Sequence, residues 1–153
     1  MIDLDELAVD TKLFEEGKKV EFGEDSHIRI RSAGSTRAQK IREELWKPYA
    51  TWTDIPKDVL DSLNAQWIAK GLLTEFVGFA ADGNLLTFDL SKEEDCERLG
   101  LILKAPKYKA LRNRFIQISL DEKNFQQAND AVLEKNSGRS RTGSSSGANT
   151  PNE

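Results

Sequence analysis

The stretch TEFVGFAADGNLLTFDLSKEEDCERLGLIL, Thr74–Leu103, places two short apolar runs on either side of Asp82-Gly83. The runs, Glu75–Phe79 and Leu85–Phe88, have the aromatic and aliphatic character that suits strands. The Asp-Gly pair between them could be an active-site loop, a metal loop or a tight turn. Asp-Gly favours a two-residue hairpin turn, and the loop lacks the alternating acids and final Glu of a calcium site. We therefore predict a β-hairpin around Asp82-Gly83.

A second hairpin is predicted nearer the N-terminus. Val20 and Phe22 alternate with polar residues, and so do Ile28 and Ile30 after the turn-rich sequence GEDS. Period-two alternation on both sides of a turn indicates two strands with one buried face. His27, the one histidine of the chain, lies in the second of these strands, where we expect a structural role.

Helical periodicity and breakers organise the rest of the chain. Ser35 or Thr36 is a good N-cap for the first helix, and Ser91 for a later one. Helices are predicted over residues 37–47, 56–73, 92–103, 106–120 and 121–135. The remainder, residues 136–153, is rich in Ser and Gly and has no bulky apolar side chain, so we expect a disordered tail. The predicted fold is α+β: a mostly helical single domain over residues 1–135, with two short β-hairpins and a disordered C-terminal tail.

The chain has a net charge of −4 that is distributed in blocks of alternating sign. Residues 1–25 and 51–103 each have a net charge of −6, whereas residues 26–50 have +4 and residues 104–120 have +5. Such blocks either pair with one another in the fold or steer a partner.

The inventory of catalytic and metal-binding residues is small. One histidine and one cysteine leave no Cys–His pair and no zinc site of the usual type. Cys96 lies among acids that disfavour its thiolate, and neither Gly-x-Gly-x-x-Gly nor Gly-Lys-Ser/Thr occurs. We predict no catalytic residue, cofactor or metal. The acidic N-terminus lacks the features of a secretory signal, and no apolar run reaches bilayer length, so we expect cytoplasmic residence.

Two clusters are candidate contact surfaces. The basic cluster comprises Lys104, Lys107, Lys109, Arg112 and Arg114. It suits phosphate contacts, but the acidic blocks around it and the lack of a nucleic-acid-binding motif favour a solvated or protein-binding face.

The aromatic cluster comprises Trp46, Tyr49 and Trp52 within a polar region. These rings either pack on the N-terminal hairpin or form a protein-binding patch, since Trp and Tyr are enriched at interfaces.

The order and spacing of these features carry a family resemblance. An acidic N-terminal piece precedes VEFGEDSHIRIR, and a helix then ends in Leu-x-x-Pro-Tyr. Further along come a helix, an aromatic-x-Gly strand, an Asp-Gly turn, Leu-x-Phe, a helix with paired leucines, a basic helix and Asn-Phe. The residues at these motifs are Leu45, Pro48, Tyr49, Phe76, Gly78, Asp82, Gly83, Leu86, Phe88, Asp121, Asn124 and Phe125. Over most of residues 1–135 the chain resembles the tail assembly chaperones of long-tailed bacteriophages.

The resemblance implies an assembly factor without enzymatic activity. Members of that family act while the tail is built: they are thought to coat the tape-measure protein and recruit tail-tube subunits. It implies residence in the host cytoplasm and absence from the mature virion, with tape-measure and tail-tube proteins as partners and self-association left open. Contact candidates are Trp46, Tyr49, Trp52, Lys107, Arg112 and Arg114. The alternatives are a structural virion component, such as a head–tail connector or minor tail protein, and a nucleic-acid-binding regulator.

Overall fold

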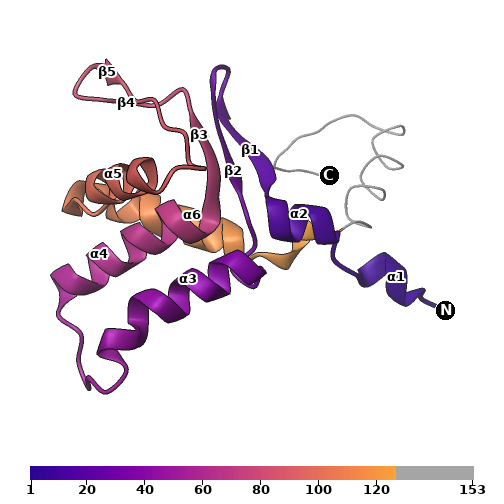
Figure 1. The fold of residues 1–153 in the computed structure, drawn as a ribbon. Coiled ribbons are helices and arrows are strands. Elements are labelled where there is room, and N and C mark those ends of the chain that lie inside the picture. Colours follow the sequence, from indigo (N-terminus) through magenta and orange to yellow (C-terminus); the bar gives the residue numbers. More distant parts are fainter. Residues whose placement is uncertain (127–153) are drawn as a thin grey trace.

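The computed structural model describes residues 1–126 and has an α+β fold, as predicted (Figure 1). One sheet contains β1 (Lys18–Gly23), β2 (Ser26–Ile30) and β3 (Leu73–Val77) in that order. The helices are α1 (Leu4–Leu7), α2 (Thr11–Glu16), α3 (Thr36–Trp46), α4 (Lys57–Trp67), α5 (Glu93–Leu103) and α6 (Lys109–Leu120). Short helical turns are η1 (Lys47–Tyr49), η3 (Pro106–Tyr108) and η4 (Glu122–Phe125).

The predicted N-terminal hairpin is confirmed. β1 and β2 pair antiparallel with Val20 opposite Ile28, and β3 adds to the other side of β2 with Phe76 opposite Ile28. These side chains therefore lie in one row and form the inner face of the sheet, where Ile28 is fully buried. The opposite face is polar, and there the Glu75 carboxylate accepts hydrogen bonds from Arg29 Nε at 3.0 Å and lies 2.9 Å from His27 Nε2.

The turn at Asp82-Gly83 is confirmed, but the predicted strand pairing around it is wrong. A very short hairpin, β4 (Ala80–Ala81) with β5 (Asn84–Leu85), closes over Asp82 at φ 52° and Gly83 at φ 80°. The longer apolar run forms β3 and pairs with β2 instead. The chain leaves β3 at Gly78, whose φ of 83° and lack of a Cβ allow it to pass against the backbone of the β1–β2 turn.

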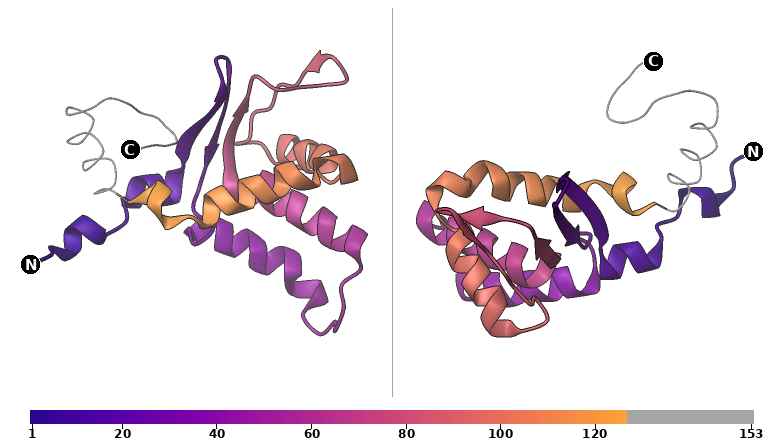
Figure 2. Two further views of the ribbon diagram at one scale, coloured as in Figure 1. Left: turned by 180° about the vertical axis from the view of Figure 1, so that it is seen from behind. Right: turned by 90° about the horizontal axis from the view of Figure 1, so that it is seen from above.

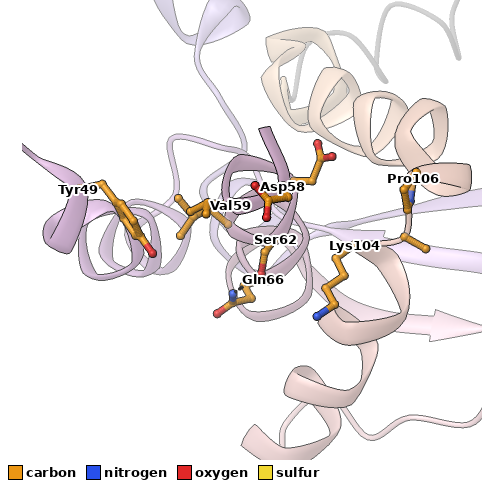
Figure 3. A pocket seen from close by; sticks show the side chains of 10 residues that line it. Tyr49, Asp58, Val59, Ser62, Gln66, Lys104 and Pro106 are labelled. Carbon is orange, nitrogen blue, oxygen red and sulfur yellow. Dashed lines mark hydrogen bonds between the residues drawn. The ribbon is translucent and has the colours of Figure 1, made fainter. Parts of the chain in front are cut away.

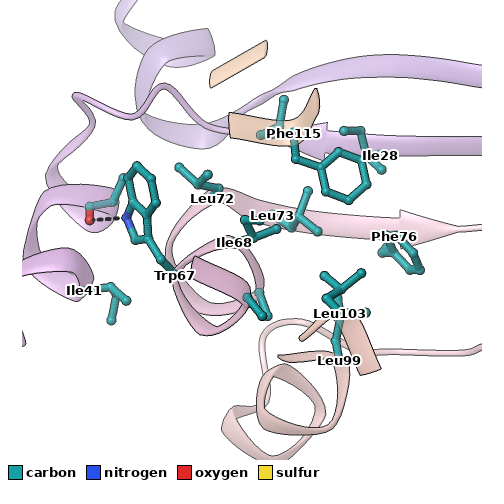
Figure 4. Packing of buried hydrophobic residues seen from close by; sticks show 14 of the residues in the cluster. Ile28, Ile41, Trp67, Ile68, Leu72, Leu73, Phe76, Leu99, Leu103 and Phe115 are labelled. Carbon is teal, nitrogen blue, oxygen red and sulfur yellow. Dashed lines mark hydrogen bonds between the residues drawn. The ribbon is translucent and has the colours of Figure 1, made fainter. Parts of the chain in front are cut away.

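The core lies between the inner face of the sheet and the helices (Figure 4). Trp67 at the end of α4 is 4% exposed and donates a hydrogen bond from Nε1 to the Ala38 carbonyl oxygen of α3 at 2.9 Å. The predicted helix over 56–73 is α-helical only to Trp67 and continues as the π-helix η2 (Ile68–Leu72). Gly71 in this segment allows Trp67 and Ile41 to pack closely against the backbone, because a Cβ there would lie 3.0 Å from the Trp67 indole and 3.3 Å from Ile41.

Two N-caps were predicted, Ser35 for α3 and Ser91 for α5, and one of them is observed. Ser35 caps α3 and accepts a hydrogen bond from the Ala38 amide at 3.3 Å, as predicted. Ser91 does not cap α5, because its hydroxyl donates instead to Asp89 Oδ1 at 2.6 Å. The predicted helix over 121–135 begins as the 3₁₀ turn η4. Residues 127–135 of that helix, and the predicted disordered tail over residues 136–153, lie outside the described residues.

Candidate protein-binding groove

A groove of about 450 Å³ lies between α4 and the turn that joins α5 to α6 (Figure 3). One wall is the exposed side of α4, and the other is the α5–α6 turn. Tyr49, from η1, lies at one side of the groove. The lining residues are Tyr49, Asp58, Val59, Asp61, Ser62, Leu63, Gln66, Lys104, Ala105 and Pro106.

Local sequence signals build both walls. Pro56 is the N-cap of α4 and Pro106 opens η3, in keeping with the tolerance of proline in a first helical turn. Asp58, Ser62 and Gln66 then recur every four residues, so they lie along one side of α4. Gln66 Nε2 donates to Ser62 Oγ at 3.0 Å, which holds two of these polar groups together.

Arg112 ties the two walls of the groove together. Its Nη1 donates to the carbonyl oxygens of Leu103 at 2.6 Å and Ala105 at 2.8 Å, both in the α5–α6 turn. Its Nη2 lies 3.1 Å from Asp61 Oδ1 on α4, outside hydrogen-bonding geometry, so this contact is an ion pair only. Arg112 is 2% exposed, and the prediction of an exposed contact residue is therefore wrong for it. The residue is buried because α6 turns it towards the carbonyl groups at the end of α5.

The two rims of the groove have opposite charge. Asp58 on α4 and Lys104 at the end of α5 are both exposed, and neither has an oppositely charged partner within 4.0 Å among residues 1–126. Asp61 is different, since Arg112 already compensates its charge. The lining between the rims includes the apolar side chains of Val59, Leu63 and Pro106. The groove thus offers apolar contact flanked by one carboxylate and one ammonium group.

The aromatic cluster separates into two parts. Tyr49 packs edge-on against Trp52, with ring centroids 4.9 Å apart, and Trp52 remains 50% exposed. Trp46 is half-buried and packs edge-on against Trp67 with ring centroids 6.3 Å apart, below the guanidinium of Arg42. The expected alternative, packing of these rings on the N-terminal hairpin, is wrong for Trp46, which packs on Trp67 of α4. Tyr49 and Trp52 extend the groove with an aromatic surface.

The exposed members of the basic cluster lie beyond the other wall. Lys107 is exposed beside Pro106, with Nζ 5.3 Å from the Tyr108 ring centroid. Arg114 is exposed further along α6, and its guanidinium lies 4.4 Å from the centroid of Phe22. The structure therefore brings Tyr49 and the start of the basic cluster to one groove, although 55 residues separate Tyr49 from Lys104 in the chain.

Sequence reasoning missed the α4 wall. Asp58, Val59 and Ser62 look like an ordinary solvated helix face, and their spacing alone carries no signal for a groove. This face of α4 becomes one wall of a groove only because Lys104–Pro106 lies opposite it in the folded protein.

Residues 1–126 contain no cluster of three or more His, Cys, Asp or Glu side chains that could hold a metal ion. Over the same residues, no helix combines the length and apolar character needed to cross a membrane. Comparisons with protein-family models, curated proteins and solved structures find no match for this chain.

Proposed function

We propose that this chain is a tail assembly chaperone of a long-tailed bacteriophage, which binds helical segments of the tape-measure protein and recruits tail-tube subunits. The observation that carries the proposal is the groove, which combines apolar side chains, the half-buried ring of Tyr49 and rims of opposite charge, with the exposed Trp52 packed against Tyr49. The order of motifs along the sequence supports the particular family.

The dimensions of the groove suit a helix. The α4 wall runs from Asp58 to Gln66, nine residues whose eight steps span about 12 Å at 1.5 Å per residue. A bound helix would therefore present about two turns, with anchors at i, i+3 or i+4, and i+7.

The apolar lining and exposed charges of the groove suit reversible binding of an apolar helix. A tape-measure chain exposes long apolar helical stripes before the tail tube encloses it, and such stripes aggregate when they are left uncovered. The groove would cover one stretch of such a stripe. Exposed charges such as those of Asp58 and Lys104 contribute little each, so a client held this way can be released to tube subunits.

Co-expression of the full chain with the tape-measure protein of the same phage tests the proposal. Val59→Glu and Pro106→Glu place a charge in the groove lining, and Leu85→Glu is the matched control, since Leu85 is 71% exposed on β5, outside the groove. We expect the groove variants to weaken co-purification at least tenfold, a loss of about 1.4 kcal/mol of binding free energy, and the control to bind normally. Equal binding by all three folded variants would remove the groove from the proposal.

The alternative, a structural virion component, makes a different prediction. Such a protein is present at fixed stoichiometry in purified particles, whereas an assembly chaperone is depleted from them. Mass-spectrometric quantification of purified virions therefore decides between the two.

A further inference from the structure

The N-terminal arm, residues 1–9, exposes an unusual amount of apolar surface. Among the described residues, eleven large hydrophobic side chains are exposed, and five of them are in this arm: Met1, Ile2, Leu4, Leu7 and Val9. Leu4 is 80% exposed and Leu7 is 58% exposed. Neither α1 nor α2 contains a buried residue. The arm therefore presents side chains of the type that form protein contacts, and the rest of the described chain, residues 10–126, does not bury them.

Within residues 1–126, hydrogen bonds attach the arm to the rest of the protein at its base only. The Asp10 amide donates to the Phe125 carbonyl oxygen at 2.7 Å, and Val9 forms an isolated bridge with Gln126. Beyond these contacts α1 extends away from the body of the protein (Figure 1). A helix of four residues is not stable by itself in water, so α1 gains from packing against another surface.

The arm is also acidic. Asp3, Asp5 and Glu6 alternate with its apolar side chains, and none has a cationic partner within 4.0 Å in the described chain. A surface that matches the arm must therefore combine positive charge with apolar area.

One surface of this protein has that combination. Lys104, Lys107, Lys109 and Arg114 form a basic face that is exposed and has no carboxylate partner within 4.0 Å among residues 1–126. The groove opens beside this face, where Val59, Ala105 and Pro106 offer apolar area. Three residues of the basic face, Lys104, Lys107 and Lys109, follow one another from the end of α5 through η3 to the start of α6. This part of the chain lies at the opposite end of the molecule from the arm (Figure 2).

We propose that the arm of one copy docks on the basic face of a second copy, with Leu4 or Leu7 at the mouth of its groove. The acids of the arm meet the lysines of the face, and the partner is a second copy of this chain. Because donor and acceptor surfaces differ, the contact is head-to-tail and leaves one free arm and one free basic face. Further copies then add at either end, so the product is a ring or an open chain of copies. This inference involves this chain alone and does not rest on the proposed function.

Sedimentation velocity of the full chain over a concentration series tests the inference. An arm variant, Leu4→Ser with Leu7→Ser, and a face variant, Lys104→Glu with Lys107→Glu, should each sediment as monomers under conditions where the wild type associates. We expect at least a tenfold weaker association for each, and weaker association of the wild type as salt increases. Leu85→Ser, an exposed apolar residue outside both surfaces, is the matched control and should associate like the wild type.

Mixing the two variants gives the sharper result. The arm variant retains an intact basic face and the face variant retains an intact arm, so an equimolar mixture should form heterodimers and nothing larger. A wild type that stays monomeric overturns the proposal. So does a folded arm variant that associates normally, or a mixture that stays monomeric while the wild type associates. Circular dichroism confirms that each variant is folded before it is scored.

Discussion

Replacing Arg112 by Met should remove the link between the two walls of the groove. The methionine side chain is neutral and similar in length, so the change deletes the guanidinium while it keeps most of the packing. Two carbonyl oxygens, of Leu103 and Ala105, lose their hydrogen bonds from Nη1, and the Asp61 carboxylate, with a side chain only 19% exposed, loses its counter-charge.

The expected cost is large relative to the stability of a domain this size. A hydrogen bond to a charged group contributes about 1.5–3 kcal/mol, and removal of one partner of a buried ion pair costs about 3–5 kcal/mol in total. We therefore expect Arg112→Met to lower the free energy of unfolding by about 3–5 kcal/mol. Since native domains are stable by about 5–15 kcal/mol, the variant should still fold but with little margin.

Urea denaturation followed by tryptophan fluorescence measures the effect. Asp61→Asn in the Arg112→Met background should recover part of the loss, since it removes the unpaired carboxylate, with a coupling of about 1–3 kcal/mol. Lys109→Met is the control on the exposed side of α6 and should change stability by less than about 0.5 kcal/mol. A loss below about 1 kcal/mol for Arg112→Met would refute the account of Arg112 as the link.

Three further predictions concern the sheet and the single thiol. Gly78→Ala should lower the free energy of unfolding by about 3 kcal/mol, because its Cβ would overlap a carbonyl of the β1–β2 turn. Gly83 also has a positive φ but has open space around it, so Gly83→Ala should lower the free energy of unfolding by about 1 kcal/mol. The hydrogen bond from Arg29 lowers the pKa of the Glu75 carboxyl below its ordinary value. Glu75→Gln should therefore lower the free energy of unfolding by at most about 1 kcal/mol near neutral pH. The difference between the variant and the wild type should vanish as pH falls through the lowered pKa. Burial raises the pKa of the Cys96 thiol, so a thiol reagent should modify it slowly in native protein and rapidly in urea.

Sequence patterns predicted the local elements well because local chemistry controls them. Alternation located β1 and β2, Ser35 capped α3, and Asp82-Gly83 formed its turn. Strand pairing depends on tertiary contacts. β3 pairs with β2 instead of with the segment that follows it, although Leu73 at the start of β3 lies 43 residues after Ile30 at the end of β2. Gly78 is the reason that the neighbouring segment turns away, and its positive φ is not visible in a sequence.

The candidate site was predicted only in part. The aromatic and basic clusters stood out by composition, and the structure brings Tyr49 and Lys104 to the same groove. Arg112 has the same charge and helical surroundings as its neighbours in the sequence. Its burial follows from tertiary contacts, because its guanidinium meets the carbonyl oxygens of Leu103 and Ala105 and the carboxylate of Asp61, and no local pattern encodes these contacts.

The most direct test of the proposed function is co-expression of the full chain with the tape-measure protein of the same phage, followed by pull-down and a solubility assay. We expect the tape-measure protein to become soluble and to co-purify with the wild type and with Leu85→Glu, and to remain insoluble with Val59→Glu. A tape-measure protein that stays insoluble and unbound in the presence of folded wild-type chain would contradict the proposed function.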